Sequence, residues 1–95
     1  MKLEARIAKV KVSHILAVIH EIRTGDVPVP PRREAKRWKL WMSRQPYPTK
    51  YVLGRAIELA TPDEDDVLPS HYSGGKFTLN ALKKILGTDS RFKIR

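Results

Sequence analysis

Two proline-bearing segments limit what this chain can fold into. The sequence GDVPVPPRR at residues 25–33 holds three prolines, and TPDEDDVLPS at residues 61–70 is polar and bounded by prolines. Proline fixes φ and lacks the backbone N–H that helices and central strands use, so regular structure is restricted to the stretches around these segments. In a chain of 95 residues, we interpret both as loops within one small domain spanning residues 1–95.

Three stretches have the apolar spacing of helices. The first runs from Ser13 through HILAVIHEIR to a stop at Gly25, and the second runs from Thr49 through KYVLGRAIELA. The third runs from Thr78 through LNALKKIL to a stop at Gly87. Serine and threonine are favoured N-caps, and glycine commonly follows the last turn of a helix. We therefore predict three helices capped by these residues.

The apolar faces of these helices predict the core. The inward residues are Ile15, Leu16, Val18, Ile19 and Ile22, then Val52, Leu53, Ala56, Ile57 and Ala60, then Leu79, Leu82, Ile85 and Leu86. Gly54 interrupts the second helix, where glycine costs about 1 kcal/mol relative to alanine. We therefore expect another part of the chain to approach the helix closely at Gly54.

Alternating side chains predict strands in two places. Trp38, Leu40 and Met42 alternate with their neighbours, and RFKIR at residues 91–95 alternates in the same way. Residues 3–10 fit a strand or a helix equally well, so the pattern leaves both open there. The predicted fold class is α+β, with about three helices and two or three short strands. Two helices before a terminal strand are compatible with a winged-helix-like arrangement.

The charge of the chain predicts a polyanionic partner. Nineteen Lys and Arg oppose ten Asp and Glu, which gives a formal net charge of +9 and a pI near 10.2. Four of the ten acids form the run DEDD at residues 63–66, so the remainder is more basic still. A short chain with this balance attracts nucleic acid. RNA suits a basic patch with tryptophans as well as DNA does.

Composition also bears on location. The chain has no cysteine, which removes disulfides and thiolate metal sites and fits a reducing cytoplasm. No apolar run approaches the roughly 20 residues of a membrane span. The N-terminal sequence MKLEARIAKVK is too polar for a signal peptide. We expect a cytoplasmic protein with no membrane association.

The segment PPRREAKRWKLW at residues 30–41 interleaves cations with tryptophans and is the first candidate binding site. Its candidate residues are Arg32, Arg33, Lys36, Arg37, Lys39 and Trp41. Cations bind phosphates without reading sequence, and aromatic rings can stack on exposed bases. If the segment is a strand, Trp38 and Trp41 point to opposite faces, so one belongs to the core and the other is exposed. Lys50 and Arg55 could extend the basic surface onto the second helix.

The stretch YSGGKFT at residues 72–78 is the second candidate site. It is not a Walker P-loop, because Phe77 follows the lysine where Ser or Thr is required. A Gly-Gly turn before a helix can still bind a phosphate at the helix N-terminus, with Ser73, Gly74, Gly75 and Lys76 as its residues. The alternative is that the turn only reverses the chain, and both can hold together. A tight turn at Gly75 predicts that Gly75→Val damages folding.

The sequence YPTKYVLGRAIELA, followed by LPSHYSGGKFTLNALKKILG, resembles the N-terminal head module of McrA-like HNH endonucleases, bacterial enzymes that cut modified DNA. The matching residues are Tyr47, Pro48 and Lys50, then Leu68, Ser73, Gly74, Gly75, Thr78, Leu82, Leu86 and Gly87, with Tyr72 in place of Phe. The resemblance covers about residues 12–87. A basic, proline-rich segment replaces the usual strand-rich middle, and no HNH nuclease follows. The resemblance implies a DNA-associated accessory module in restriction or defence.

No residue pattern predicts an active site, a metal site or a cofactor. His14 and His20 are six residues apart, which is a poor spacing for one helical face and lacks the HExxH arrangement. The DEDD run reads as a solvated loop, since adjacent carboxylates repel one another. We therefore expect a non-enzymatic DNA-binding module. The alternatives are a protein-interaction module that docks an acidic partner, and an RNA-binding protein.

Overall fold

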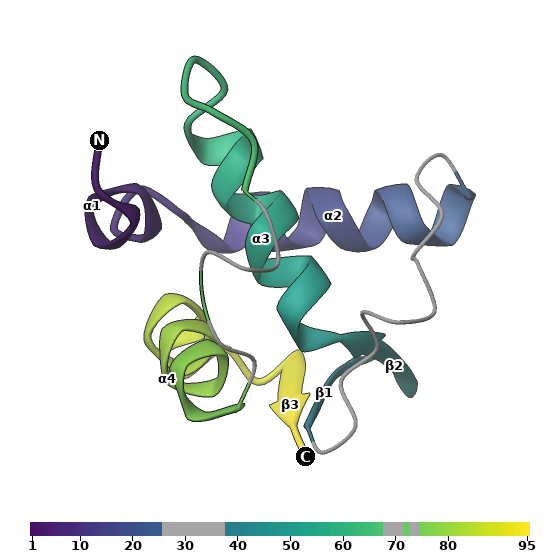
Figure 1. Ribbon diagram of the computed structural model, residues 1–95. Helices are drawn as coiled ribbons and strands as arrows, with labels where there is room; N and C mark the ends of the chain where they lie inside the picture. Colours follow the sequence, from purple (N-terminus) through teal and green to yellow (C-terminus); the bar gives the residue numbers. More distant parts are fainter. Residues whose placement is uncertain (26–37, 68–71, 73–74) are drawn as a thin grey trace.

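The computed structural model describes residues 1–25, 38–67, 72 and 75–95 (Figure 1). Within these residues the chain forms four helices and a three-stranded antiparallel sheet, which confirms the α+β class. The elements are α1 (Leu3–Ile7), α2 (Val12–Thr24), β1 (Lys39–Met42), β2 (Gln45–Pro48), α3 (Thr49–Ala60), α4 (Gly75–Leu86) and β3 (Phe92–Ile94). Every helix in the described part is too short or too polar to cross a lipid bilayer.

Helix α3 runs through the middle of the fold and contacts most other elements (Figure 1). Its Val52, Leu53, Ala56 and Ile57 are inaccessible to solvent, as the apolar spacing predicts. Helices α1, α2 and α4 pack around it, and strand β2 leads directly into its first turn. Burial of a Val, Leu or Ile side chain contributes about 1.5–3 kcal/mol, so the buried face of α3 contributes strongly to stability.

Helix α2 supplies the second row of the core, with Ile15, Val18 and Ile19 buried. It begins at Val12, one residue before the predicted cap Ser13. The ring nitrogen Nδ1 of His14 accepts a hydrogen bond from the Lys11 N–H at 2.9 Å, so a histidine serves the helix start in place of the serine. The predicted stop at Gly25 is confirmed by a left-handed φ of 76°.

The two predicted threonine caps are wrong as well. Thr49 is the first helical residue of α3, and its hydroxyl donates to the carbonyl oxygen of Trp38 at 3.3 Å. Thr78 lies inside α4, which starts three residues earlier, and its side chain is buried. The Thr49 hydroxyl is thus placed by a contact outside its own helix. The stop at Gly87 is confirmed, with a φ of 57°.

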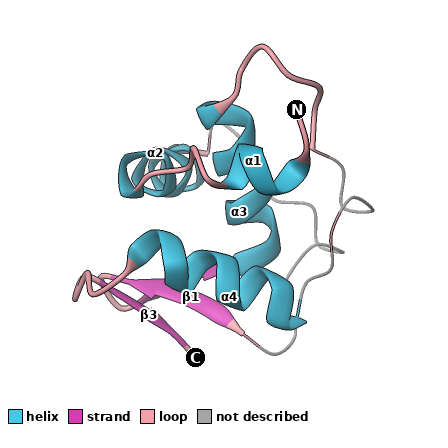
Figure 2. Cartoon of the chain, turned by 90° about the vertical axis from the view of Figure 1, so that its left-hand side faces the viewer, coloured by secondary structure: helices cyan, strands magenta, loops and turns pink. Residues whose placement is uncertain are grey.

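The described sheet has the order β2-β1-β3 and forms the bottom layer of Figure 2, with α4 above it. Leu40 pairs with Tyr47 on one side and with Ile94 on the other. Leu40, Tyr47 and Phe92 are buried and attach the sheet to the helices. Strand β2 contains Pro46 and Pro48, which suits its place at the sheet edge because proline cannot donate to a ladder.

A two-residue turn joins β1 to β2. Its residues, Ser43 and Arg44, have φ angles of 52° and 65°. Positive φ at both central residues is the signature of a type I′ hairpin turn, which usually carries Asn-Gly or Gly-Gly. The exposed Arg44 therefore occupies the tip of a hairpin that the turn sequence Ser-Arg does not predict.

Residues 3–10 form helix α1 and a short connection after it. Of the strand and the helix that the sequence left open, the structure has the helix. Arg6 is only 6% exposed, and its Nε donates to the Thr61 hydroxyl oxygen at 2.9 Å. Thr61 in turn donates to the carbonyl oxygen of Ile57 at 2.8 Å. This chain of bonds docks α1 on the C-terminal end of α3.

Gly54 allows a close approach, as the sequence predicts. The Tyr72 hydroxyl lies against it and donates to the carbonyl oxygen of Lys50, one turn earlier. A Cβ atom built on Gly54 would come within 2.6 Å of the Tyr72 oxygen. The tyrosine thereby fixes the segment before α4 against the first half of α3.

We predict that Gly54→Ala lowers the free energy of unfolding by about 1–3 kcal/mol, because the new methyl group displaces Tyr72. In a Tyr72→Phe background the oxygen is gone, and the same substitution should be neutral or stabilising through a helix-propensity gain of about 1 kcal/mol. Urea denaturation followed by circular dichroism measures all four proteins. Additive losses in the double variant would contradict the contact.

Candidate nucleic-acid interface

The described residues include half of the predicted binding residues. Arg32, Arg33, Lys36, Arg37, Ser73 and Gly74 lie outside the described part of the chain, and their predicted roles stay predictions. The described ones are Lys39, Trp41, Lys50, Arg55, Gly75 and Lys76. These six lie in different elements and do not form one site. Lys39 and Trp41 share a face of the sheet, whereas Lys50, Arg55, Gly75 and Lys76 belong to α3 and α4.

The side of the sheet away from the helices gathers basic residues around one aromatic ring. Because side chains alternate along a strand, the burial of Leu40 turns Lys39 and Trp41 outward. Lys93 of β3 pairs directly with Trp41. Two residues later, the backbone N–H of Arg95 donates to the Lys39 carbonyl oxygen and the Arg95 carbonyl oxygen accepts the Lys39 N–H, each at 3.1 Å. We call Lys39, Trp41, Lys93 and Arg95 the outer sheet face.

Trp41 holds this cluster together. Its indole Nε1 donates to the carbonyl oxygen of Arg95 at 3.3 Å, and the Arg95 guanidinium lies 5.0 Å from the centre of its ring. Such a cation–π contact contributes about 0.5–1 kcal/mol at an exposed site. The tryptophan therefore orients an arginine and has one ring face already covered.

The expectation that one of the two tryptophans enters the core is wrong. Trp38 is 37% exposed, and Trp41 is half-buried under Arg95. Leu40, between them, takes the inward position of the strand, and Trp38 precedes the first residue of β1. An aliphatic side chain thus fills the place that the sequence assigned to an indole ring.

The outer sheet face is positive and is not neutralised by the described carboxylates. Lys93 and Arg95 are exposed, Lys39 is half-buried, and none of the three forms an ion pair with a described Asp or Glu. Arg44, also exposed, stands at the hairpin tip next to β1. The arrangement can hold several phosphate groups along a line, because each cation keeps its charge available.

Sequence reasoning missed Lys93 and Arg95. The alternation of RFKIR predicted a strand, and that strand is confirmed as β3. Nothing in the sequence says which strand it pairs with, and the pairing with β1 is what brings both cations to Trp41. The combination of a basic, alternating terminal segment with a basic, aromatic strand is the signal that could have suggested them.

A local ion pair directs the chain into β3. The Asp89 carboxylate accepts the backbone N–H and the Nε–H of Arg91, both at 3.0 Å, and also pairs with Nη2 at 2.7 Å. Hydrogen bonding to the Arg91 side chain lowers the pKa of Asp89 below its ordinary 3.8. A lowered pKa favours the folded turn at pH above the ordinary value and loses this effect as the pH falls through the folded-state pKa. The turn is therefore fully charged at neutral pH.

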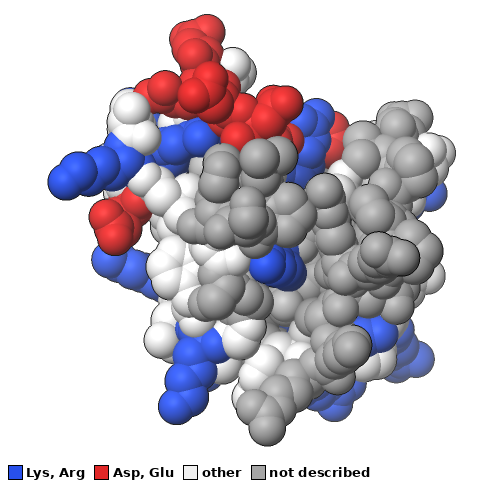
Figure 3. Space-filling view, viewed as in Figure 1, with Lys and Arg blue, Asp and Glu red and all other residues white. Residues whose placement is uncertain are grey.

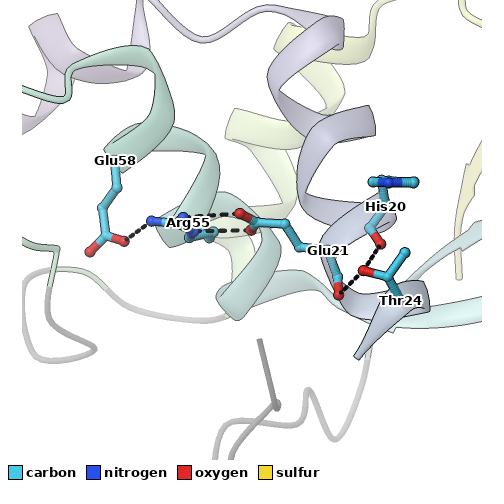
Figure 4. Close-up of polar contacts among 5 residues, drawn as sticks. All are labelled: His20, Glu21, Thr24, Arg55 and Glu58. Carbon is cyan, nitrogen blue, oxygen red and sulfur yellow. Dashed lines mark hydrogen bonds and ion pairs between the residues drawn. The ribbon is translucent and has the colours of Figure 1, made fainter. Parts of the chain in front are cut away.

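Arg55 has its charge matched inside the fold, contrary to the expectation of a free surface cation. Figure 4 shows its guanidinium between Glu21 of α2 and Glu58 of α3. Nε and Nη2 donate to the two Glu21 oxygens, each at 3.0 Å, and Nη1 donates to Glu58 at 3.2 Å. The hydrogen bonds to Glu21 raise the pKa of Arg55 further above its ordinary value. Arg55 joins two helices and is not available to a phosphate.

Glu58 and Thr24 extend this polar network. The second oxygen of Glu58 accepts the N–H of the buried Val67 at 2.9 Å, which anchors the end of the loop after α3. The Thr24 hydroxyl bonds the carbonyl oxygens of His20 and Glu21 at the last turn of α2 (Figure 4). The Arg55–Glu21 pair joins α2 to α3, and these further bonds fix the last turn of α2 and the loop after α3.

Lys50 and Lys76 have separate surroundings. The Lys50 ammonium lies 5.3 Å from the centre of the Tyr72 ring, and that ring contacts Phe77 with 6.0 Å between centroids. Lys76 is exposed in the first turn of α4. The described part of the predicted turn therefore packs Tyr72 between α3 and Phe77 and leaves one lysine in solvent.

Gly75 is not a strained turn residue. It is the first residue of α4, has no left-handed φ, and a Cβ atom built on it would meet nothing within 4 Å. The expectation that valine at this position damages the fold is therefore wrong for Gly75. Gly87 also has open space around it, but its φ is 57°.

Acidic residues gather away from the sheet. In Figure 3 most red atoms lie at the top, over the loop after α3, while blue atoms follow the left and lower edges. Glu64 of this loop pairs with the N-terminal ammonium at 3.2 Å. Among the described residues, no group of three or more His, Cys, Asp or Glu is placed to hold a metal ion. The acids of the loop after α3 thus lie apart from the basic sheet, as the DEDD run lies apart from the basic segments in the sequence.

Comparison of the chain with protein-family models, with curated proteins and with solved structures finds no match. The likeness to McrA-like head modules therefore stays a prediction, as does the winged-helix interpretation. The residues that carry that likeness and are described have roles within the fold. Tyr47 is buried in the core, and Lys50 and Tyr72 contact one another over Gly54.

We predict that Arg55→Met lowers the free energy of unfolding by about 1.5–3 kcal/mol, because hydrogen bonds to charged groups on two helices are lost. Arg23→Met is the matched control, since Arg23 is exposed near the end of α2 and has no ion pair with a described carboxylate. Its expected change is within about 0.5 kcal/mol. Thermal and urea denaturation measure both, and equal losses would refute the structural role of Arg55.

A glycine pair separates backbone strain from crowding. We predict that Gly75→Val changes stability by less than about 1 kcal/mol, because the site is open and helical. Gly87→Val should cost about 1–2 kcal/mol or more, since a branched residue is forced into the left-handed region. Both variants are compared by thermal denaturation. A larger loss at Gly75 than at Gly87 would restore the tight-turn interpretation.

Proposed function

We propose that this protein is a non-enzymatic module that binds the phosphate backbone of duplex DNA through its outer sheet face. The observation that carries the proposal is the convergence of Lys39, Lys93 and Arg95 around Trp41 with no described carboxylate paired to them. Contacts of this kind position a protein on DNA and supply affinity without reading sequence.

Three further observations, and the resemblance noted in the sequence, support this choice. The net charge is +9, and the acidic loop lies at the end of the molecule away from the sheet. Arg37 precedes Lys39 by two residues in the sequence, so the predicted cations Arg32, Arg33, Lys36 and Arg37 are attached to the strand that carries the outer sheet face. The resemblance to McrA-like head modules favours DNA, and a role in restriction or defence, over RNA.

The state of Trp41 favours phosphate contact over base stacking. Proteins that hold single strands offer free aromatic faces on which successive bases stack. Here Arg95 already lies over the Trp41 ring, so the face presents a guanidinium where a stacking platform would present an indole. A guanidinium binds phosphate oxygens in pairs, which suits a duplex backbone.

The test is fluorescence anisotropy with matched duplex DNA, single-stranded DNA and RNA, with and without modified cytosines, at two salt concentrations. We expect the variant Lys39→Gln, Lys93→Gln, Arg95→Gln to lose roughly tenfold in duplex affinity per cation at about 0.1 M salt and to lower the salt slope by about 2–3. The control is Lys2→Gln, Lys9→Gln, Lys83→Gln, which removes the same charge from exposed positions elsewhere.

Equal losses in the two triple variants would mean generic attraction to a basic chain. An unchanged affinity in the first variant, with a loss on changing Arg32, Arg33, Lys36 and Arg37 to Glu, would move the interface to that segment. Tighter binding to structured RNA than to DNA would favour the RNA alternative. No binding to any nucleic acid at low salt would refute the proposal.

A further inference from the structure

An apolar groove lies on the side of α4 opposite the sheet. It has a volume of about 710 Å³ and runs between α1 and the start of α2 on one wall and α4 on the other (Figure 2). Its apolar lining is Ile7, Ala8, Val10, Val12, Phe77, Ala81 and Ile85. The volume is within the range of protein ligand sites, and the walls are helical on both sides.

Helix α4 has two apolar faces. Leu79, Leu82 and Leu86 are buried and face the core. Phe77, Ala81 and Ile85 recur every four residues on a second face and line the groove. Phe77 is 37% exposed and is one of the large exposed hydrophobic residues of the described chain. Ala81 and Ile85 are half-buried, so this second apolar stripe is only partly covered within the described structure.

The rim of the groove is mainly basic. Lys11 and Lys84 line it from opposite walls, and both are exposed. Glu4 is the single carboxylate of the lining, and none of these three forms an ion pair among the described residues. An occupant with apolar residues in its centre and acids at its sides would match this distribution.

We propose that the groove binds an amphipathic helix from a partner protein, with apolar residues at a spacing of i, i+4 and i+7 and acidic residues beside them. The stripe from Phe77 to Ile85 spans nine residues, or about 12 Å of helix, which is about the length of two turns of a ligand helix. The basic rim determines that the flanking charges of the partner are negative.

Other occupants fit less well. A nucleic-acid backbone gains nothing from seven apolar lining residues. A second copy of this chain has its acidic run in the loop at residues 63–66, DEDD, which contains no apolar residue. Because α4 and the sheet separate the groove from the outer sheet face, a partner helix and DNA can be bound together (Figure 2). The proposal does not depend on DNA binding.

The experiment selects ligands for the whole protein from a phage-displayed library of random peptides, each about 16 residues long and so long enough to form a bound helix. Enriched peptides are synthesised, and their Kd is measured by fluorescence anisotropy against the wild-type protein, Asn80→Trp, Lys84→Glu and Lys83→Glu. Asn80 is exposed in the groove lining, so Asn80→Trp fills the groove. Lys83 is exposed next to Lys84 but does not line the groove.

We expect enriched peptides to have the stated apolar spacing with Asp or Glu beside it. Asn80→Trp should abolish their binding, Lys84→Glu should weaken it by about tenfold, and Lys83→Glu should change it by less than about twofold. Peptides that are basic, or that bind Asn80→Trp as well as wild type, would overturn the proposal. Binding of the fatty acid laurate in the absence of binding by any peptide would also overturn it. So would self-association in sedimentation equilibrium that Asn80→Trp abolishes.

Discussion

The enclosure of helix α3 is the constraint on which the rest of this structure depends. In a small domain only a limited interior exists, and here four consecutive inward positions of one helix occupy its centre, Val52, Leu53, Ala56 and Ile57. Helices α1, α2 and α4 each reach their position by covering part of that surface. The two close polar contacts on α3, Tyr72 over Gly54 and Arg55 between Glu21 and Glu58, then set the spacing and register of its neighbours.

The basic face follows from this core. The sheet turns Leu40, Tyr47 and Phe92 toward the helices, so the alternate residues of β1 and β3 have no interior to enter. Evolution can place charge there without a desolvation cost, since the side chains remain in water. Helix α4 carries the other exposed surface. Its stripe of Phe77, Ala81 and Ile85 is apolar and lines the groove, so water contacts apolar side chains there. The molecule thus offers two surfaces of opposite chemistry on either side of one helix–sheet layer.

Much of the fold was predictable from periodicity. The spacing of apolar residues predicted the buried residues of α2, α3 and α4, except that Ile85, expected inward, lines the groove. Gly25 and Gly87 marked where helices end. Alternation predicted β1 and β3. Helix starts were predicted poorly. Ser13, Thr49 and Thr78 have good capping chemistry, but α2 starts with a bond between His14 and Lys11, α3 starts at Thr49 itself, and α4 starts three residues before Thr78.

The hairpin and the site were harder for a different reason. Ser43 and Arg44 adopt a turn that local sequence preferences disfavour, so the pairing of the flanking strands must supply the energy. Arg55 looks like a surface residue until α2 brings Glu21, which is 34 positions away in the sequence, against it. Lys93 and Arg95 acquire a common neighbour only through strand pairing. Long-range contacts of this kind leave no periodic trace in a single sequence.

The order of the strands also has a consequence for folding. Strand β1 pairs with β2 across a two-residue turn, but the residues that join at Trp41 and Arg95 are 54 positions apart in the chain. Closing a loop of that length is slow relative to forming a hairpin, so we expect β1 to pair with β2 before it pairs with β3. During synthesis the hairpin also emerges well before β3. Until β3 pairs, Trp41 lacks the arginine that covers it in the folded protein.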